Sequence, residues 1–294
     1  MRLPRHTMIR TLRCAAFICL ALVACKKGDA VPAYIVVPAV TLTATAEEGG
    51  ATSRITDVWI SVNDRSLGVW ELPAKVPVLA SGQNTLSITP AIKRNGSFDD
   101  RLRYPFYTTW NGPVELLPEQ TTEVDPVVTY EEAANFWVES FDEAGSDFAV
   151  SEDSDTTLLL YTAVEHPEIT LDGTSCSGFV LEPERDRISL YTDQGFAGAS
   201  GPSFVELDYS TDVDLTLGVT YIQDGVSRAA PWAVLVPTTS IGGLRWNKVY
   251  IEVSSFIGEG SIMDREFYIT AALPSGQGSA HVYLDNIKLV RRDP

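Results

Sequence analysis

The stretch Phe204-Val-Glu-Leu-Asp-Tyr209 places apolar side chains at every second position. In an extended chain, this alternation puts Val205 and Leu207 on one face and Glu206 and Asp208 on the other. A helix would scatter the same residues around its axis, because its side chains repeat every 3.6 positions. The stretch therefore predicts a β-strand with one buried face.

The same period of two recurs along the whole chain. It is found in the following ranges: 40–44, 58–62, 86–88, 215–221, 249–253, 267–271 and 281–290. Turn residues separate these runs, and Asn95-Gly96 is a strong hairpin signal. We therefore expect an all-β protein.

The run at 281–290 changes parity within itself. Val282 and Leu284 share one face, whereas Ile287 and Leu289 would point to the other. One extra residue near Asp285-Asn286 would return both pairs to the core. The sequence therefore predicts a β-bulge at this position.

Two β-domains fit the length of the chain. Residues 31–130 hold roughly seven short strands in about 100 residues, which is typical of an immunoglobulin-like sandwich. Residues 131–294 hold longer alternating runs, which favour a jelly-roll β-sandwich. We expect Glu131-Glu-Ala-Ala134 to form a short helical link between the two.

Residues 1–24 have the pattern of a secretory signal peptide. Four arginines precede a short apolar run that is about half as long as a membrane-spanning helix. Leu22-Val-Ala-Cys25 then resembles the lipobox of bacterial lipoproteins. The resemblance implies cleavage before Cys25, a diacylglycerol anchor on its sulfur and a tether over 25–30. Lys26 stands where many lipoproteins retained in the inner membrane carry aspartate, which favours the outer membrane in either leaflet.

The charge of the chain excludes one class of partner. It has 22 Lys and Arg against 39 Asp and Glu, a formal net charge of −17. Nucleic-acid affinity rests mainly on neutralising phosphates, so we expect no nucleic-acid partner.

Signatures of catalysis are absent from the sequence. It contains no HExxH or GxSxG motif and no glycine-rich phosphate loop. Glu206-Leu-Asp208 resembles the first half of the E-x-D-x-x-E motif of laminarinase-like hydrolases, but Thr211 stands in place of the acid/base. Cys176 has no cysteine partner nearby and is interpreted as structural. We therefore expect no enzyme, with glycoside hydrolysis as the third hypothesis.

Four segments of the second block resemble a galactose-binding-like or carbohydrate-binding jelly roll. They are 137–142, 205–209, 246–253 and 283–289. With a lipid anchor and an immunoglobulin-like spacer, the architecture is similar to the glycan-binding lipoproteins of polysaccharide-utilisation systems. The resemblance also implies a structural Ca²⁺ between the first and last strands, held by Glu139 or Asp142 and by Asp285, since Ca²⁺ takes six to eight oxygen ligands.

Aromatic side chains are the candidates for sugar contact. Tyr250 and Tyr268 have parity opposite to their core neighbours, and Trp232 follows Pro231 near an expected loop. We expect Trp232, Tyr250 and Tyr268 to bind a ligand. The first hypothesis is a non-catalytic surface lipoprotein that binds carbohydrate. The alternative is an assembly lipoprotein that packs against an outer-membrane protein and binds no sugar.

Overall fold

The computed structural model describes residues 31–143, 145–239 and 243–292. The predicted signal peptide, Cys25 and the tether lie outside these residues. Within them, no helix combines the length and the apolar character that crossing a membrane requires.

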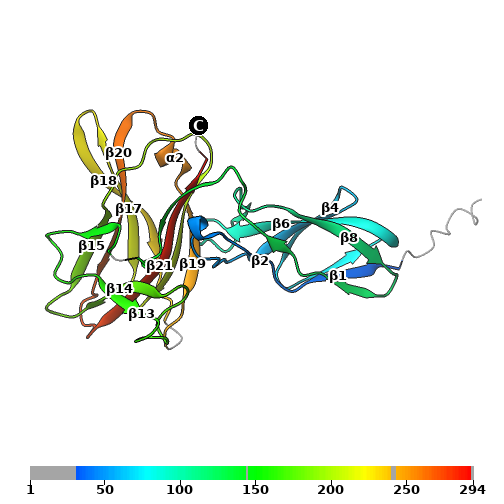
Figure 1. Ribbon diagram of the computed structural model, residues 1–294, viewed down its shortest axis with the longest axis horizontal. Helices are drawn as coiled ribbons and strands as arrows, with labels where there is room; N and C mark the ends of the chain where they lie inside the picture. The colour runs from blue at the N-terminus through cyan, green and yellow to red at the C-terminus, as the bar shows by residue number, and fades with distance from the viewer. Residues whose placement is uncertain (1–30, 144, 240–242, 293–294) are drawn as a thin grey trace, which may run out of the picture.

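The described chain is nearly all β, as the alternation predicted (Figure 1). The first domain has two layers. One consists of β5-β1-β9 with the short pair β10-β2, and the other consists of β4-β3-β6-β7 with β8 also paired to β6. Its strands are β1 (Ala33–Val37), β2 (Thr41–Leu42), β3 (Asp57–Val62), β4 (Arg65–Glu71), β5 (Ala74–Val78), β6 (Gly82–Lys93), β7 (Arg101–Arg103), β8 (Trp110–Leu116), β9 (Thr121–Glu123) and β10 (Val127–Val128).

The second domain is a sandwich of two larger sheets. The order β13-β14-β21-β16-β19, with β11 paired to β21, forms what we call the covered sheet. The order β12-β15-β20-β17-β18 forms the open sheet. The strands are β11 (Asn135–Glu139), β12 (Phe148–Val150), β13 (Leu159–Thr162), β14 (Ser175–Leu181), β15 (Arg187–Thr192), β16 (Ser203–Thr211), β17 (Leu215–Gln223), β18 (Val226–Leu235), β19 (Asn247–Glu252), β20 (Ile262–Ala272) and β21 (Ala280–Arg291).

Each domain has its own cluster of buried apolar side chains. In the second domain, the alternating residues of β16, β17 and β20 fill the space between the two sheets, Val205, Leu217 and Ile269 among them. Alternation directs one face of each strand into this core. The expectation of a single buried face is wrong for β16, because all nine of its residues are buried and the first domain covers its outer face. The expected helix at 131–134 is wrong, because the segment forms a turn closed by Ala134 N–H and Glu131 C=O at 2.9 Å.

The predicted bulge is confirmed. Glu206 of β16 pairs with Lys288, but Asp208 pairs with Asp285, so β21 carries one residue more than its partner. Asn286 takes the left-handed conformation with φ 45°. As a result, Leu284 and Ile287 both reach the core.

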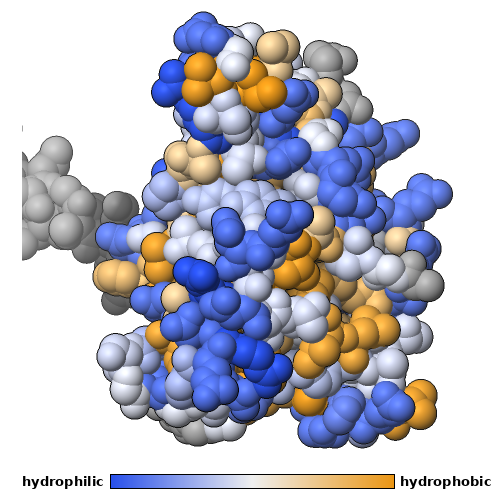
Figure 2. Space-filling model, turned by 90° about the vertical axis from the view of Figure 1, so that its left-hand side faces the viewer, coloured by the Kyte–Doolittle hydropathy of each residue, from blue (hydrophilic) through white to orange (hydrophobic). Residues whose placement is uncertain are grey.

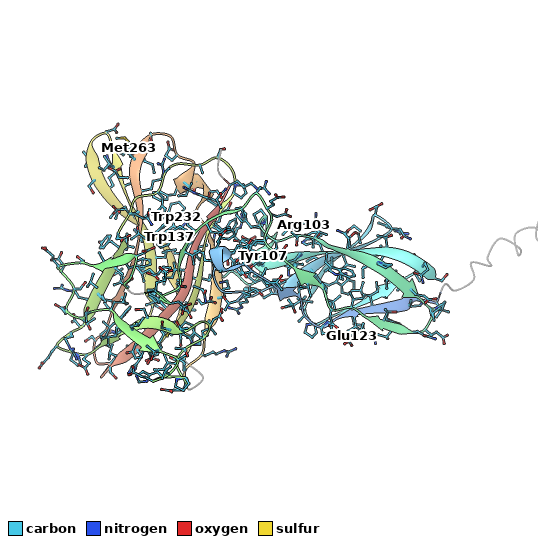
Figure 3. All side chains as sticks on the ribbon, viewed as in Figure 1. Arg103, Tyr107, Glu123, Trp137, Trp232 and Met263 are labelled. Carbon is cyan, nitrogen blue, oxygen red and sulfur yellow. The ribbon has the colours of Figure 1, made fainter. Side chains whose placement is uncertain are left out.

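The first domain packs against the outer face of the covered sheet, and the open sheet lies on the opposite side of the molecule (Figure 1). Phe204, Tyr250 and Val290 of the second domain belong to the buried cluster of the first. Tyr107 lies at this junction (Figure 3). One broad face of the second domain is therefore closed and the other is free.

Candidate functional site

A row of residues crosses the open sheet on its outer face. Strand register places Ala149 beside Tyr191, Tyr191 beside Tyr268, Tyr268 beside Gly218, and Gly218 beside Pro231. The row thus runs from β12 to β18 at right angles to the strands. Figure 2 shows this side of the molecule, where hydrophilic residues surround scattered hydrophobic patches.

Gly218 lets the ring of Tyr268 lie down on the sheet. A Cβ at Gly218 would stand 1.9 Å from Cζ of Tyr268, so any other residue would displace the ring. The rings of Tyr191 and Tyr268 lie side by side, with centroids 5.6 Å apart and planes 39° from each other. Partial burial, and then the neighbouring Tyr191, raise the pKa of the Tyr268 hydroxyl. Two aromatic rings therefore form a floor, which we call the tyrosine platform.

Polar side chains flank the tyrosine platform on both sides. Thr220 Oγ1 donates to Glu266 Oε2 at 3.0 Å on one side. On the other, the hydroxyls of Ser189 and Thr270 lie 3.1 Å apart. Ligand sites commonly combine aromatic contact area with a few placed polar groups, and this face offers both.

Tyr268 lies on an outer face, as its parity predicted, but the expected exposure of Tyr250 is wrong. Tyr250 is 1% exposed, because the first domain covers the outer face of β19. Its hydroxyl shares a hydrogen bond of 3.0 Å with Tyr107 and accepts one from the Arg54 backbone N–H at 2.9 Å. Tyr250 therefore joins the two domains and offers no surface to a ligand.

Trp232 lies in β18, and the expectation of a loop position is wrong. The register between β17 and β18 shifts after Leu217, so that Gly218 faces Pro231 and Trp232 is the extra residue. The indole turns to the core, where it packs near Phe256, and its Nε1 donates to the Glu252 carbonyl at 3.0 Å. Figure 3 labels Trp232 within the second domain. Trp232 is partly buried against the core and thus stabilises the sandwich.

The carboxylates with hydrolase spacing are buried between the domains. Glu206 is 0% exposed and accepts hydrogen bonds from the hydroxyls of Tyr104, at 2.7 Å, and Tyr130, at 2.9 Å. Lys248 Nζ lies 3.1 Å from Asp208 and 3.4 Å from Glu206. Glu206 has no exposed surface, so a glycan cannot reach both carboxylates and the pair supports no two-carboxylate hydrolysis.

The three predicted calcium ligands are not brought together in one group. Both oxygens of Glu139 accept backbone N–H groups, from Phe141 at 2.7 Å and from Asp147. Asp142 Oδ1 likewise accepts backbone N–H groups, whereas Asp285 keeps one buried oxygen without a hydrogen bond. Across the described residues, no group of three or more His, Cys, Asp or Glu side chains is placed to hold a metal ion. The calcium site stays a prediction.

Tyr191 and Gly218 were not predicted from the sequence as residues of the site. Tyr191 could have been found, because it has parity opposite to the core residues Ile188 and Leu190. Gly218 gave no comparable signal. Its role depends on the pairing of β17 with β20, which no local pattern specifies.

No protein-family model and no curated protein sequence matches the chain. Solved structures similar to it include the xylan-binding domain of a family 22 carbohydrate-binding module (10% identity, 56% of this chain and 99% of that one, TM-score 0.38). Others are a family 61 module in complex with β-1,4-galactotriose (15%, 50% and 88%, 0.33) and a point mutant of a family 29 module (11%, 54% and 94%, 0.34). The structural neighbours are thus carbohydrate-binding β-sandwiches.

Proposed function

We propose that this protein is a non-catalytic, lipid-anchored carbohydrate-binding protein whose ligand lies across the tyrosine platform. The observation that carries the proposal is the pair of rings, Tyr191 and Tyr268, laid on the open sheet over Gly218. Sugars present apolar C–H faces that pack on aromatic rings, and their hydroxyls need polar partners at the edges.

The polar edges of the platform fit such a ligand. Thr220, Glu266, Ser189 and Thr270 offer hydroxyl and carboxylate groups on both sides of the rings. All four are half-buried, so their oxygens are ordered yet reachable from solvent. The row has no wall at either end, since Ala149 and Pro231 are exposed. A chain of several sugar units therefore fits better than a single enclosed sugar.

The position of the platform suits a protein held by its N-terminus. The described chain enters β1 at the end of the first domain that is far from the second domain (Figure 1). The open sheet lies at the opposite end of the molecule. An anchor on Cys25 would therefore leave the platform pointing away from the membrane, with the immunoglobulin-like domain as a spacer.

A glycan array with the soluble protein from Lys26 tests the proposal. We expect binding to one class of oligosaccharide, and a loss of at least tenfold in affinity, about 1.4 kcal/mol, in Tyr268→Ala and Tyr191→Ala. Tyr34→Ala is the matched control, because Tyr34 lies on the first domain beside Lys75. A blank array from folded wild-type protein would refute the proposal and make an assembly partner the next question.

A further inference from the structure

A cleft runs along the seam between the two domains, away from the tyrosine platform. It consists of two adjoining hollows of about 370 and 430 Å³. Arg54, Arg245 and Asn247 line both hollows and mark the point where they meet. Arg54 comes from the first domain, whereas the other two precede and begin β19. The seam cleft therefore exists only when the domains are packed together.

The seam cleft is positively charged in a strongly acidic chain. The guanidinium groups of Arg54 and Arg245 form no ion pair with any residue that the structure describes, and the side chain of Arg54 donates only to Asn247 Oδ1. Asp208 is the one acid in the lining, and its Oδ2 already accepts hydrogen bonds from Thr52 and Lys248. Two exposed cations without carboxylate partners thus face the same space.

Apolar walls adjoin these cations. Trp246 lines one hollow, and its indole is fixed by a hydrogen bond of 2.9 Å from Nε1 to the Ile169 carbonyl. Val234 and Val236 line the other hollow and are more than half exposed. A ligand that suits this lining carries an oxyanion for the arginines beside a surface of C–H groups for the indole.

We propose that the seam cleft binds the carboxylate of an acidic sugar, such as a uronic acid unit of a glycan. Arg54 and Arg245 would hold the carboxylate, because the planar guanidinium fork matches its two oxygens. The face of the sugar ring packs against Trp246. This site lies on the seam rather than on the open sheet, so it is independent of the tyrosine platform and extends the proposed function to acidic glycans.

Calorimetric titration with a galacturonic acid trimer, and with a galactose trimer as the neutral counterpart, tests the inference. Arg54→Gln and Arg245→Gln should each weaken binding of the acidic trimer at least tenfold, because each removes a charge-assisted hydrogen bond to the carboxylate. Binding should also weaken as salt rises. Arg65→Gln, an exposed arginine of β4, is the matched control and should bind as the wild type does.

Four outcomes would overturn the inference. The first is no binding of the acidic trimer to folded wild-type protein. The second is equal affinity for both trimers. The third is unchanged affinity for the acidic trimer in both arginine variants. The fourth is binding of inorganic sulfate as tight as that of the trimer, which would show a site for the anion alone. Tyr268→Ala separates the two proposals, because it should weaken binding at the tyrosine platform at least tenfold and leave binding in the seam cleft unchanged.

Discussion

Replacing Lys248 with methionine should lower the free energy of unfolding more than the replacement of any other lysine in the described chain. Lys248 is 5% exposed, and its Nζ lies within 3.4 Å of three acceptors, on Asp208, Glu206 and Thr52. Methionine fills a similar volume but removes the ammonium that lies within 3.4 Å of both carboxylates. Breaking a buried ion pair in this way costs about 3–5 kcal/mol.

The cost of protonating Asp208 gives a stability loss of similar size. Burial raises the pKa of Asp208, while the neighbouring Lys248 ammonium lowers it. Removing Lys248 takes away a cause that lowers this pKa, so the neutral carboxyl becomes more favourable in the folded state. Binding a proton at pH 7 to a group whose ordinary pKa is about 3.9 costs about 4 kcal/mol. This sets the upper limit of the loss that Asp208 can cause.

The loss should depend on pH. In Lys248→Met, the folded state binds a proton that the unfolded state releases, so stability should recover as the pH falls from 7 toward 4. Urea unfolding at pH 7 and pH 5 measures both effects, with Lys75→Met, an exposed lysine of β5, as the control. A loss below about 1 kcal/mol at pH 7, or one that is equal at pH 5, would refute this account of the interface.

Three further predictions concern Lys288, Trp232 and the predicted calcium ligands. Burial lowers the pKa of Lys288 to about 8, so the unfolded chain binds more protons above that value. The free energy of unfolding of the wild type should therefore rise between pH 8 and 9.5, by at most about 1.4 kcal/mol per pH unit, whereas that of Lys288→Met should not. Urea unfolding measures both, and the same pH dependence in the two proteins would contradict this. Trp232→Phe should lower the free energy of unfolding by about 1–2 kcal/mol, because it removes the hydrogen bond to the Glu252 carbonyl, and should leave glycan affinity unchanged. Lower glycan affinity in a folded Trp232→Phe variant would show that Trp232 belongs to the binding site. If Ca²⁺ binds at Glu139, Asp142 and Asp285, millimolar calcium should raise the melting temperature of the wild type but not of Asp285→Asn, and no shift in the wild type would exclude the site.

The sequence predicts the fold class well because each strand carries its own evidence. One face of β16, β17 or β20 is buried wherever it lies in the sandwich, so alternation alone identifies it. The bulge at Asn286 was predictable for the same reason, since the parity of the apolar residues changes within one strand.

The candidate site was only partly predictable, because parity separates two faces of a strand without saying what covers the outer one. Tyr250 and Tyr268 carry the same local signal. The first domain buries Tyr250, whereas nothing in the described chain covers Tyr268. The prediction for Trp232 was wrong for another reason, because a register shift in β18 turns its side chain toward the core. Contacts between distant strands and between domains decide these positions.

Exchanging Gly218 for alanine is the most direct test of whether a glycan packs on the tyrosine platform, because the exchange removes no aromatic group and no hydrogen bond. The new Cβ would stand 1.9 Å from Tyr268 Cζ, so the ring must leave the sheet. Titrating the best glycan from the array into wild type and Gly218→Ala compares a flat platform with a disrupted one in proteins of nearly equal composition. We expect at least a tenfold loss of affinity with the fold retained, as measured by circular dichroism. Unchanged affinity in a folded Gly218→Ala variant would contradict it.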